Sequence, residues 1–306
     1  MEGKSVKKPT AESAKPGTDG KDVQQTSNND ADHHALGQKT IADVCEALIG
    51  AAFLTHDVRG EWTPGSWRDA IRAVTYLVGS EDHRFTEWSQ YSQSYVKPAY
   101  QIAVPNASQL DLAAQVAKAY PYKFRHPRLL RSAFVHPSQP FAWEGIPSYQ
   151  RLEFLGDSLL DLACVTHLYY HFPDKDPQWL TEHKMAMVAN KFLGVVCVEL
   201  GFHRHLRHNS SAIQHQISEY VAELAEAERM SNGAKDYWTE VKDPPKCLAD
   251  IVEAFVGALF IDSDFDYSQV QKFFDLQMKP FFVDMDIYDS FANNHPIVSV
   301  AQAVSS

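Results

Sequence analysis

The chain has 306 residues, of which 44% are hydrophobic and 12% aromatic, and it carries a formal net charge of −11 at pH 7. This composition is typical of a globular protein with one or two domains. The acidic balance argues against a protein that holds nucleic acid by charge alone, because phosphate contacts need clustered Lys and Arg. No stretch approaches the roughly 20 apolar residues that cross a bilayer, and the N-terminus lacks the apolar core of a signal peptide. We therefore expect an intracellular protein, cytoplasmic or nuclear, without a membrane partner.

Residues 1–38 are rich in Lys, Ser, Asp, Asn and Gly and show no apolar period, which predicts a disordered, low-complexity segment. Helical periodicity begins in 38–54 and returns in 66–79. Residues 79–105 are polar and aromatic with helix breakers, and we interpret them as a connector that is ordered only in part. Its aromatic side chains in 88–100 could stack on bases, although a folded connector is the simpler interpretation.

A longer unit follows in 106–286, and 287–306 form a short tail. Within the long unit, apolar periodicity predicts helices near 110–119, 127–135, 148–171, 179–200, 216–229, 245–261 and 267–278. Alternation with a period of two is scarce, so the predicted fold class is all-α. The four cysteines are widely separated and form no C-x-x-C pair, which favours reduced, buried thiols over disulfides or zinc ligands.

The segment LADIVEAFVGALFID (248–262) is apolar yet contains Asp250 and Glu253, three residues apart. Burying an unpaired carboxylate costs several kcal/mol even after relaxation. A basic partner, protonation or a bound cation could offset that cost.

This segment is duplicated within the chain. Residues 41–57 align without a gap on 248–264, with eight identities in seventeen positions. The identities include Asp43 with Asp250 and Glu46 with Glu253, so both acids recur in the same apolar frame. A chance pair of acids would not bring its surroundings along.

A second acidic pair lies in RLEFLGDSLLDL (151–162), where Glu153 and Asp157 are four residues apart and share one face of a helix. Gly156 lies between them, although glycine costs a helix interior about 1 kcal/mol relative to alanine. A glycine here could allow another backbone or a ligand to come close.

Two helices would thus present four carboxylates from largely apolar surfaces. Taken alone, each pair could be a solvated surface feature, but two pairs in apolar frames favour a metal site. Hard oxygen ligands suit Mg²⁺ or Mn²⁺, and such a site could polarise a phosphodiester.

These motifs resemble the paired motifs of the ribonuclease III family, and the similarity extends through LLRSAFVHPS and MVANKFLGVVCVELGFHRHL. The tandem arrangement resembles the C-terminal region of the Dicer branch of that family. The resemblance implies a complete second ribonuclease III domain in 106–286, preceded in 39–105 by the C-terminal part of a first domain and a connector.

The resemblance also implies a function, namely cleavage of double-stranded RNA by a two-metal mechanism that leaves 5′-phosphate and 3′-hydroxyl ends. Mg²⁺ or Mn²⁺ would be held by Glu153, Asp157, Asp250 and Glu253, and Lys246 would lie near the scissile phosphate. Asp43 and Glu46 would be metal ligands of the first domain. Family members pair two such domains, within one chain or in a homodimer. Gene silencing and antiviral defence follow from the resemblance alone.

The chain departs from the family pattern in its first domain. Only 42 residues precede Asp43, and none of them contains E-x-x-x-D within an apolar run. The sequence is a fragment, its start is misplaced, or the missing pair comes from another chain. A catalytically incomplete scaffold that dimerises or binds a partner is therefore the alternative function.

Two further expectations concern charge. His203, His205 and His208 lie together in GFHRHLRHNS, which predicts a basic surface at a helix end rather than a metal site. Because the chain is acidic overall, we expect its RNA affinity to be weak and sensitive to salt.

Overall fold

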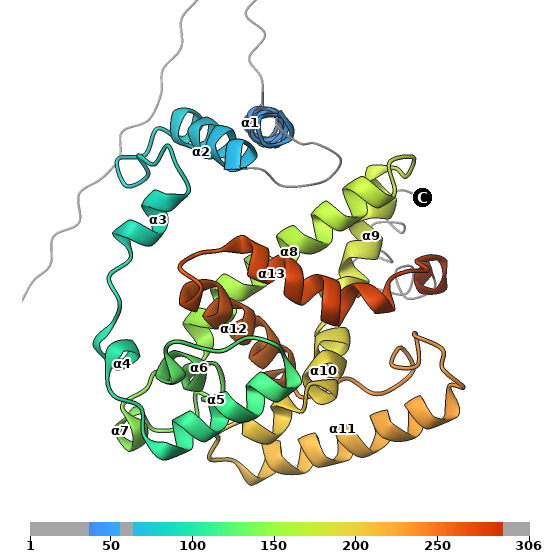
Figure 1. Cartoon of the computed structure of the whole chain (residues 1–306). Helices are drawn as coiled ribbons and strands as arrows, with labels where there is room; N and C mark the ends of the chain where they lie inside the picture. Colours follow the sequence, from blue (N-terminus) through green and yellow to red (C-terminus); the bar gives the residue numbers. More distant parts are fainter. Residues whose placement is uncertain (1–36, 56–63, 290–306) are drawn as a thin grey trace, which may run out of the picture. The chain divides into compact units, whose positions relative to one another are not determined.

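The computed structural model describes residues 37–55 and 64–289, and every regular element in these ranges is a helix (Figure 1). The only extended pairing described is a single bridge between Val135 and Arg207. The all-α prediction is therefore confirmed. The chain divides into two compact units at Ala47 and Leu48. The domain limits inferred from sequence stay predictions, and most of the predicted disordered segment (1–38) and tail (287–306) lies outside the described residues.

The N-terminal helices follow the predicted pattern. Helix α1 spans Gln38–Leu54 and α2 spans Pro64–Val78. The connector contains two short helices, α3 (Ser89–Ser94) and α4 (Ala99–Ile102). Trp88 Nε1 donates a hydrogen bond to the carbonyl oxygen of Phe265 at 2.7 Å, which anchors this segment. The contact favours a folded connector over a free stacking surface.

The remaining helices lie further along the second unit, which also contains α2, α3 and α4. They are α5 (Ala107–Ala119), α6 (Pro127–Ala133), α7 (Phe141–Glu144), α8 (Gln150–His171), α9 (Pro177–Met187), α10 (Asn190–Glu199), α11 (Ser211–Met230), α12 (Cys247–Asp262) and α13 (Tyr267–Phe273), which continues into a π-helical turn (Phe274–Met278).

The single helix predicted over 179–200 is wrong, because the chain breaks into α9 and α10. Ala189 has an extended backbone (φ −61°, ψ 137°) and interrupts the helical hydrogen bonds. Met187 before the break and Phe192 after it are both fully buried. Because of the break, two helices of different direction each place an apolar face in the same core. No glycine or proline at the break signals it in the sequence.

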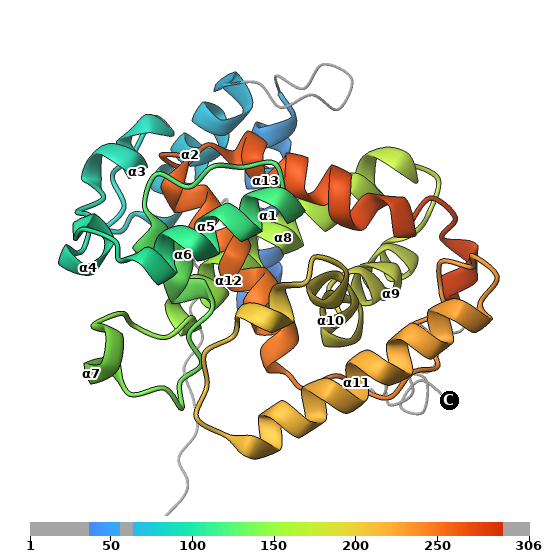
Figure 2. The same ribbon diagram turned by 60° about the horizontal axis from the view of Figure 1, so that its bottom comes forward.

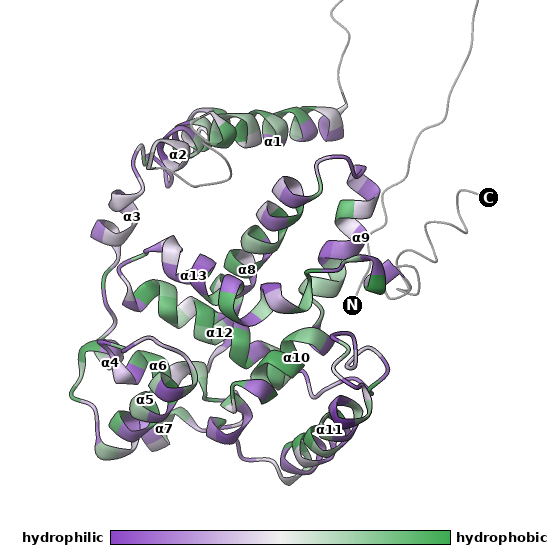
Figure 3. Cartoon of the chain, turned by 45° about the vertical axis from the view of Figure 1, so that its right-hand side comes forward, coloured by the Kyte–Doolittle hydropathy of each residue, from purple (hydrophilic) through white to green (hydrophobic). Residues whose placement is uncertain are grey.

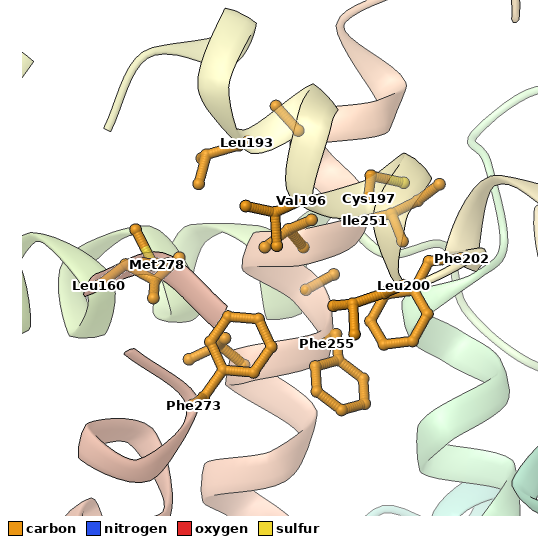
Figure 4. Packing of buried hydrophobic residues seen from close by; sticks show 14 of the residues in the cluster. Leu160, Leu193, Val196, Cys197, Leu200, Phe202, Ile251, Phe255, Phe273 and Met278 are labelled. Atoms are coloured by element: carbon orange, nitrogen blue, oxygen red, sulfur yellow. The ribbon is translucent and has the colours of Figure 1, made fainter. Parts of the chain in front are cut away.

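Helix α12 is the centre of the second unit (Figures 1 and 2). All sixteen of its residues are buried, and it packs against α8, α10, α6 and α13. A helix that is covered on all sides has no solvent-facing stripe, which explains its continuous apolar sequence. The hydropathy colouring shows the same contrast, with α10 and α12 largely hydrophobic and α11 mixed (Figure 3). Figure 4 shows Phe255 of α12 among Phe202, Phe273 and Leu200.

Helices α8 and α12 cross at two glycines. A Cβ atom added to Gly156 would lie 1.7 Å from the carbonyl oxygen of Glu253, and one added to Gly257 would lie 2.3 Å from that of Leu152. Neither position has room for any side chain. The close approach of another backbone, expected at Gly156, is therefore confirmed, and the helices meet backbone against backbone.

Helix α1 has the same sequence frame as α12 but a different environment. None of its residues is buried, and Ile41, Val44 and Leu48 are about half exposed, whereas their counterparts in α12 are fully buried. A Cβ added to Gly50, the counterpart of Gly257, would contact nothing within 4 Å. Among the described residues, the duplicated element thus has no counterpart of α8 against it.

The four cysteines are free, in agreement with the expected thiols. Cys164, Cys197 and Cys247 are buried, and Cys45 is partly exposed. In the described part of the chain, no helix combines the length and the apolar character that crossing a membrane requires.

Candidate metal centre

The crossing of α8 and α12 brings acidic residues from both helices together. Glu153 lies in the first turn of α8, Asp250 lies in the first turn of α12, and Glu253 follows Asp250 by one turn. One carboxylate oxygen from each of these three residues lies within 4.8 Å of the other two. The backbone contact at Gly156, whose Cβ would meet the carbonyl of Glu253 itself, fixes the spacing of these acids.

Asp157, the fourth predicted acid, does not join this group of three. It is exposed, one helical turn after Glu153. Its negative charge nevertheless acts on the cluster, because it is one of the causes that raise the pKa of Glu253. The structure therefore brings three of the four acids together and leaves Asp157 at the solvent edge.

Lys246 precedes α12 and provides the basic partner. Its Nζ donates to Oε1 of Glu153 at 2.8 Å and also to Oδ1 of Asp250. Burial by itself lowers the pKa of Lys246, but the hydrogen bonds to Asp250 and Glu153 outweigh it and raise that pKa. The ammonium group thus lies between carboxylates from two helices, whose positions in the sequence are 97 residues apart.

Tyr149 is a member of the site that the sequence analysis missed. Its hydroxyl donates to Oδ2 of Asp250 at 2.8 Å, and both residues are buried. Burial, and then the charge of Asp250, raise the pKa of Tyr149, so the phenol remains a donor. Because Lys246 donates to Oδ1, both carboxylate oxygens of Asp250 accept a hydrogen bond. A signal was present, since Tyr149 lies one helical turn before Glu153.

The carboxyl group of Glu253 is buried and has a strongly raised pKa. Burial raises its pKa to about 8, with further increases from the charges of Asp157 and Asp250. No hydrogen-bond or ion-pair partner of its carboxyl group is found among the described residues. At neutral pH the metal-free site therefore holds a proton on Glu253.

The site thus uses two of the three ways to accommodate buried acids, namely a lysine for Glu153 and Asp250 and protonation for Glu253. The unpaired carboxyl of Glu253 is the observation that fits the third way, a bound cation. Three carboxylates, with one oxygen of each within 4.8 Å of the other two, form a hard donor set that suits Mg²⁺ or Mn²⁺. A cation here would replace the proton and compete with the ammonium group of Lys246.

Asp43 and Glu46 are placed differently from their counterparts. Both are exposed on α1, and Asp43 lies 3.6 Å from Nζ of Lys39. No third acid joins them in a potential metal site within the described ranges. Their proposed role as ligands of a first domain has no geometric support comparable to that of Asp250 and Glu253.

The basic surface predicted at the three histidines stays a prediction, and His203 and His205 contribute little positive charge to it. Both are partly buried, and burial lowers the pKa of each, with a further decrease from Arg204. Burial therefore disfavours the protonated form of both imidazoles. The permanent charge of this segment comes from Arg204 and Arg207, which are exposed.

Comparison with known proteins agrees with this geometry. Residues 150–264, which include α8, α12 and all four predicted acids, match the family model described as Ribonuclease III domain. The chain contains a ribonuclease III domain.

Relatives of this ribonuclease III domain include fungal proteins. The chain is 59% identical over 274 residues to Dicer-like protein 1 of Phaeosphaeria nodorum and 54% identical over 263 residues to that of Aspergillus oryzae. These alignments cover 89% and 86% of this chain but only 18% and 17% of the relatives' own lengths. Among solved structures, the nuclease domain of ribonuclease III from Campylobacter jejuni is 23% identical, with a TM-score of 0.39 over 55% of this chain.

Proposed function

We propose that this chain is part of a Dicer-like, metal-dependent endoribonuclease that cleaves double-stranded RNA. The observation that carries the proposal is the convergence of Glu153, Asp250 and Glu253 at a glycine crossing within a ribonuclease III domain. The names of its relatives support the Dicer-like assignment. The proposed reaction hydrolyses a phosphodiester to a 5′-phosphate and a 3′-hydroxyl.

Glu153, Asp250 and Glu253 would hold Mg²⁺ or Mn²⁺. Asp157, exposed beside them, would serve a second cation that arrives with the substrate. A bound divalent cation would polarise the phosphodiester and lower the pKa of a water molecule. Tyr149 keeps Asp250 oriented, and Glu253 gives up its proton as the cation binds. Lys246, released from the carboxylates, would neutralise charge on the scissile phosphate.

The decisive experiment is a cleavage assay with the purified chain and a long RNA duplex. We expect Mg²⁺-dependent shortening that is lost in Asp250→Asn and Glu153→Gln, with 5′-phosphate ends on the products. Lys242→Met, which changes an exposed lysine paired with Glu219 and Glu223, is the matched control and should cleave normally. Cleavage that persists in EDTA or in Asp250→Asn would refute the proposal.

Production of small RNAs for gene silencing and antiviral defence, in the cytoplasm or nucleus, extends the proposal to the biological role. It is supported by the similarity to Dicer-like proteins. Deletion of the gene should abolish small RNAs derived from an introduced inverted repeat, and sequencing of small RNAs would measure this.

A catalytically incomplete scaffold is the second candidate, and the state of α1 favours it. Ile41, Val44 and Leu48 are about half exposed, and a Cβ added to Gly50 would meet nothing within 4 Å. By contrast, if two ribonuclease III domains pair, within a chain or in a homodimer, we expect both strands of the RNA duplex to be cut. Duplex binding without Mg²⁺-supported cleavage, in a chain that still takes up Mn²⁺, would favour the scaffold.

A further inference from the structure

A second polar centre lies away from the acidic cluster, at the start of α5. Ser108 is the second residue of this 13-residue helix, after the N-cap Asn106. Its side chain is exposed. Nη2 of Arg131 lies 3.4 Å from Ser108 Oγ, and Nη2 of Arg207 lies 3.5 Å from the same atom. A neutral hydroxyl therefore lies between two guanidinium groups.

Arg131 is the unusual member of this centre. It is 3% exposed, and its Nε has no hydrogen-bond partner. Its contacts are all long: 3.5 Å to the carbonyl oxygen of His205, 3.4 Å to that of Ser108, and 3.7 Å to the carboxylate of Glu144. A buried guanidinium normally has close, charged acceptors. Nη2 of Arg131 instead contacts uncharged oxygens of Ser108, the carbonyl oxygen and Oγ.

We propose that Ser108 is a phosphorylation site whose phosphate is bound by Arg131, Arg207 and the N-terminus of α5. Arginine pairs phosphate through short, parallel hydrogen bonds. The first turn of a helix adds N–H groups and a positive dipole end, although in α5 the N–H of Gln109 already donates to Oδ1 of the N-cap Asn106. The position thus supplies elements that stabilise a phosphoserine, while the unmodified hydroxyl offers the two guanidinium groups only long, neutral contacts of 3.4 and 3.5 Å.

The chemical step is a phosphoryl transfer from a nucleoside triphosphate by a protein kinase. A bond forms between Ser108 Oγ and the γ-phosphorus, the bond from that phosphorus to the bridging oxygen breaks, and a nucleoside diphosphate leaves. The hydroxyl proton passes to the kinase base. The exposed residues 102–104 and 106–107 precede Ser108, so a kinase can approach from this side, although Gln109 is buried and the first turn of α5 must open.

The modified residue would join three segments. Arg131 belongs to α6, and the backbone of Arg207 is paired with the residues that follow α6, because its N–H donates to Phe134 and its carbonyl accepts from His136. Two acids oppose the phosphate: Glu144, beside Nε of Arg131, and Asp111, one turn further along α5. Two guanidinium groups lie within 3.5 Å of Ser108 Oγ, and the contact of Glu144 is to Nε of Arg131 rather than to the Nη2 atom that contacts Ser108.

The test compares the chain carrying genetically encoded phosphoserine at 108 with the unmodified chain. We expect the melting temperature to rise by about 2–4 °C, the shift that roughly 1 kcal/mol gives a chain of this size. In ³¹P NMR the second pKa of the phosphate should fall below its usual value of about 6. Both effects should shrink in Arg207→Gln, an exposed position that leaves the core intact.

Phosphoserine at Ser211 is the matched control. Ser211 begins α11, a longer helix, and no arginine contact to it is found in the described structure. It should show a smaller shift than phosphoserine at 108 and no dependence on Arg207. Equal behaviour of the two sites, or an unchanged shift in Arg207→Gln, would overturn the proposed binding. In protein purified from native cells with phosphatase inhibitors, mass spectrometry should detect the peptide with phosphorylated Ser108. Detection of only the unmodified peptide would overturn the proposed modification.

Discussion

The hydroxyl of Tyr149 donates to Oδ2 of Asp250 at 2.8 Å in the buried wall of the acidic cluster. Removing it in Tyr149→Phe frees one oxygen of Asp250 while the ring remains in place. Because residues that orient metal ligands typically contribute 10- to 100-fold to affinity, we expect Mn²⁺ affinity to fall about 10-fold. Isothermal titration calorimetry would measure it.

The control for this prediction is Tyr220→Phe, which removes a hydroxyl from another fully buried tyrosine whose contact is the carbonyl of Lys191. It should lower stability without changing Mn²⁺ affinity. Equal Mn²⁺ affinity in the wild-type protein and Tyr149→Phe would show that Tyr149 does not position Asp250 for a cation.

Lys246→Met should have opposite effects on binding and on cleavage. In the metal-free protein the ammonium group occupies the space between Glu153 and Asp250, so a cation must displace it. Without this competing charge, Mn²⁺ affinity should rise by about 10-fold, a modest part of the Coulomb energy between charges at this separation. The rate of RNA cleavage should fall, because the variant has no ammonium group to neutralise the charge on the scissile phosphate. Weaker Mn²⁺ binding would refute the competition.

Glu253→Gln tests the buried proton through the pH dependence of stability. The pKa of Glu253 is raised to about 8 in the folded protein, against about 4.3 in an unfolded chain. Between these values only the folded state keeps the proton, so the stability of the metal-free wild type falls as pH rises and levels off above about 8. Glutamine stays neutral, so in EDTA at pH 8.5 Glu253→Gln should be more stable, on the order of 2 kcal/mol.

Denaturant melts at pH 4 and pH 8.5 would measure this difference, which should vanish at the lower pH. The same proton must leave when a cation binds. The enthalpy of Mn²⁺ binding at pH 7 should therefore depend on the ionisation enthalpy of the buffer, and apparent affinity should increase up to about pH 8. A buffer-independent enthalpy would show that Glu253 is already ionised.

Gly257→Ala and Gly50→Ala form a matched pair, because the two glycines occupy the same position of the duplicated element. A Cβ at Gly257 would lie 2.3 Å from the carbonyl oxygen of Leu152, whereas one at Gly50 would meet nothing within 4 Å. We expect Gly257→Ala to cost more than about 3 kcal/mol, since backbone cannot yield as a side chain does. Gly50→Ala should stabilise α1 by up to about 1 kcal/mol. Thermal melts of both variants would measure these changes in stability. Equal changes in the two variants would contradict the close crossing of α8 and α12.

The sequence predicted those parts of the fold that are encoded within one helix. The positions of α8 and α12, the acids on them and the crowded environment of Gly156 follow from local periodicity and an unusual residue. The hydrogen bond from Lys246 to Glu153 could not be predicted, because it joins residues 93 positions apart. The break before Asn190 and the partial burial of His203 likewise depend on the core that surrounds them, and no nearby residue signals either.

The crossing of α8 and α12 also determines when the site can form during synthesis. Glu153 emerges from the ribosome about a hundred residues before Asp250, and α12 ends only at Asp262. Until that helix is released, Leu152 and Gly156 have no backbone to pack against, and the nascent chain has neither the central helix of its core nor an assembled acidic cluster. A nascent chain that ends before Asp262 therefore cannot yet bring Glu153, Asp250 and Glu253 together, so formation of the acidic cluster depends on the release of α12.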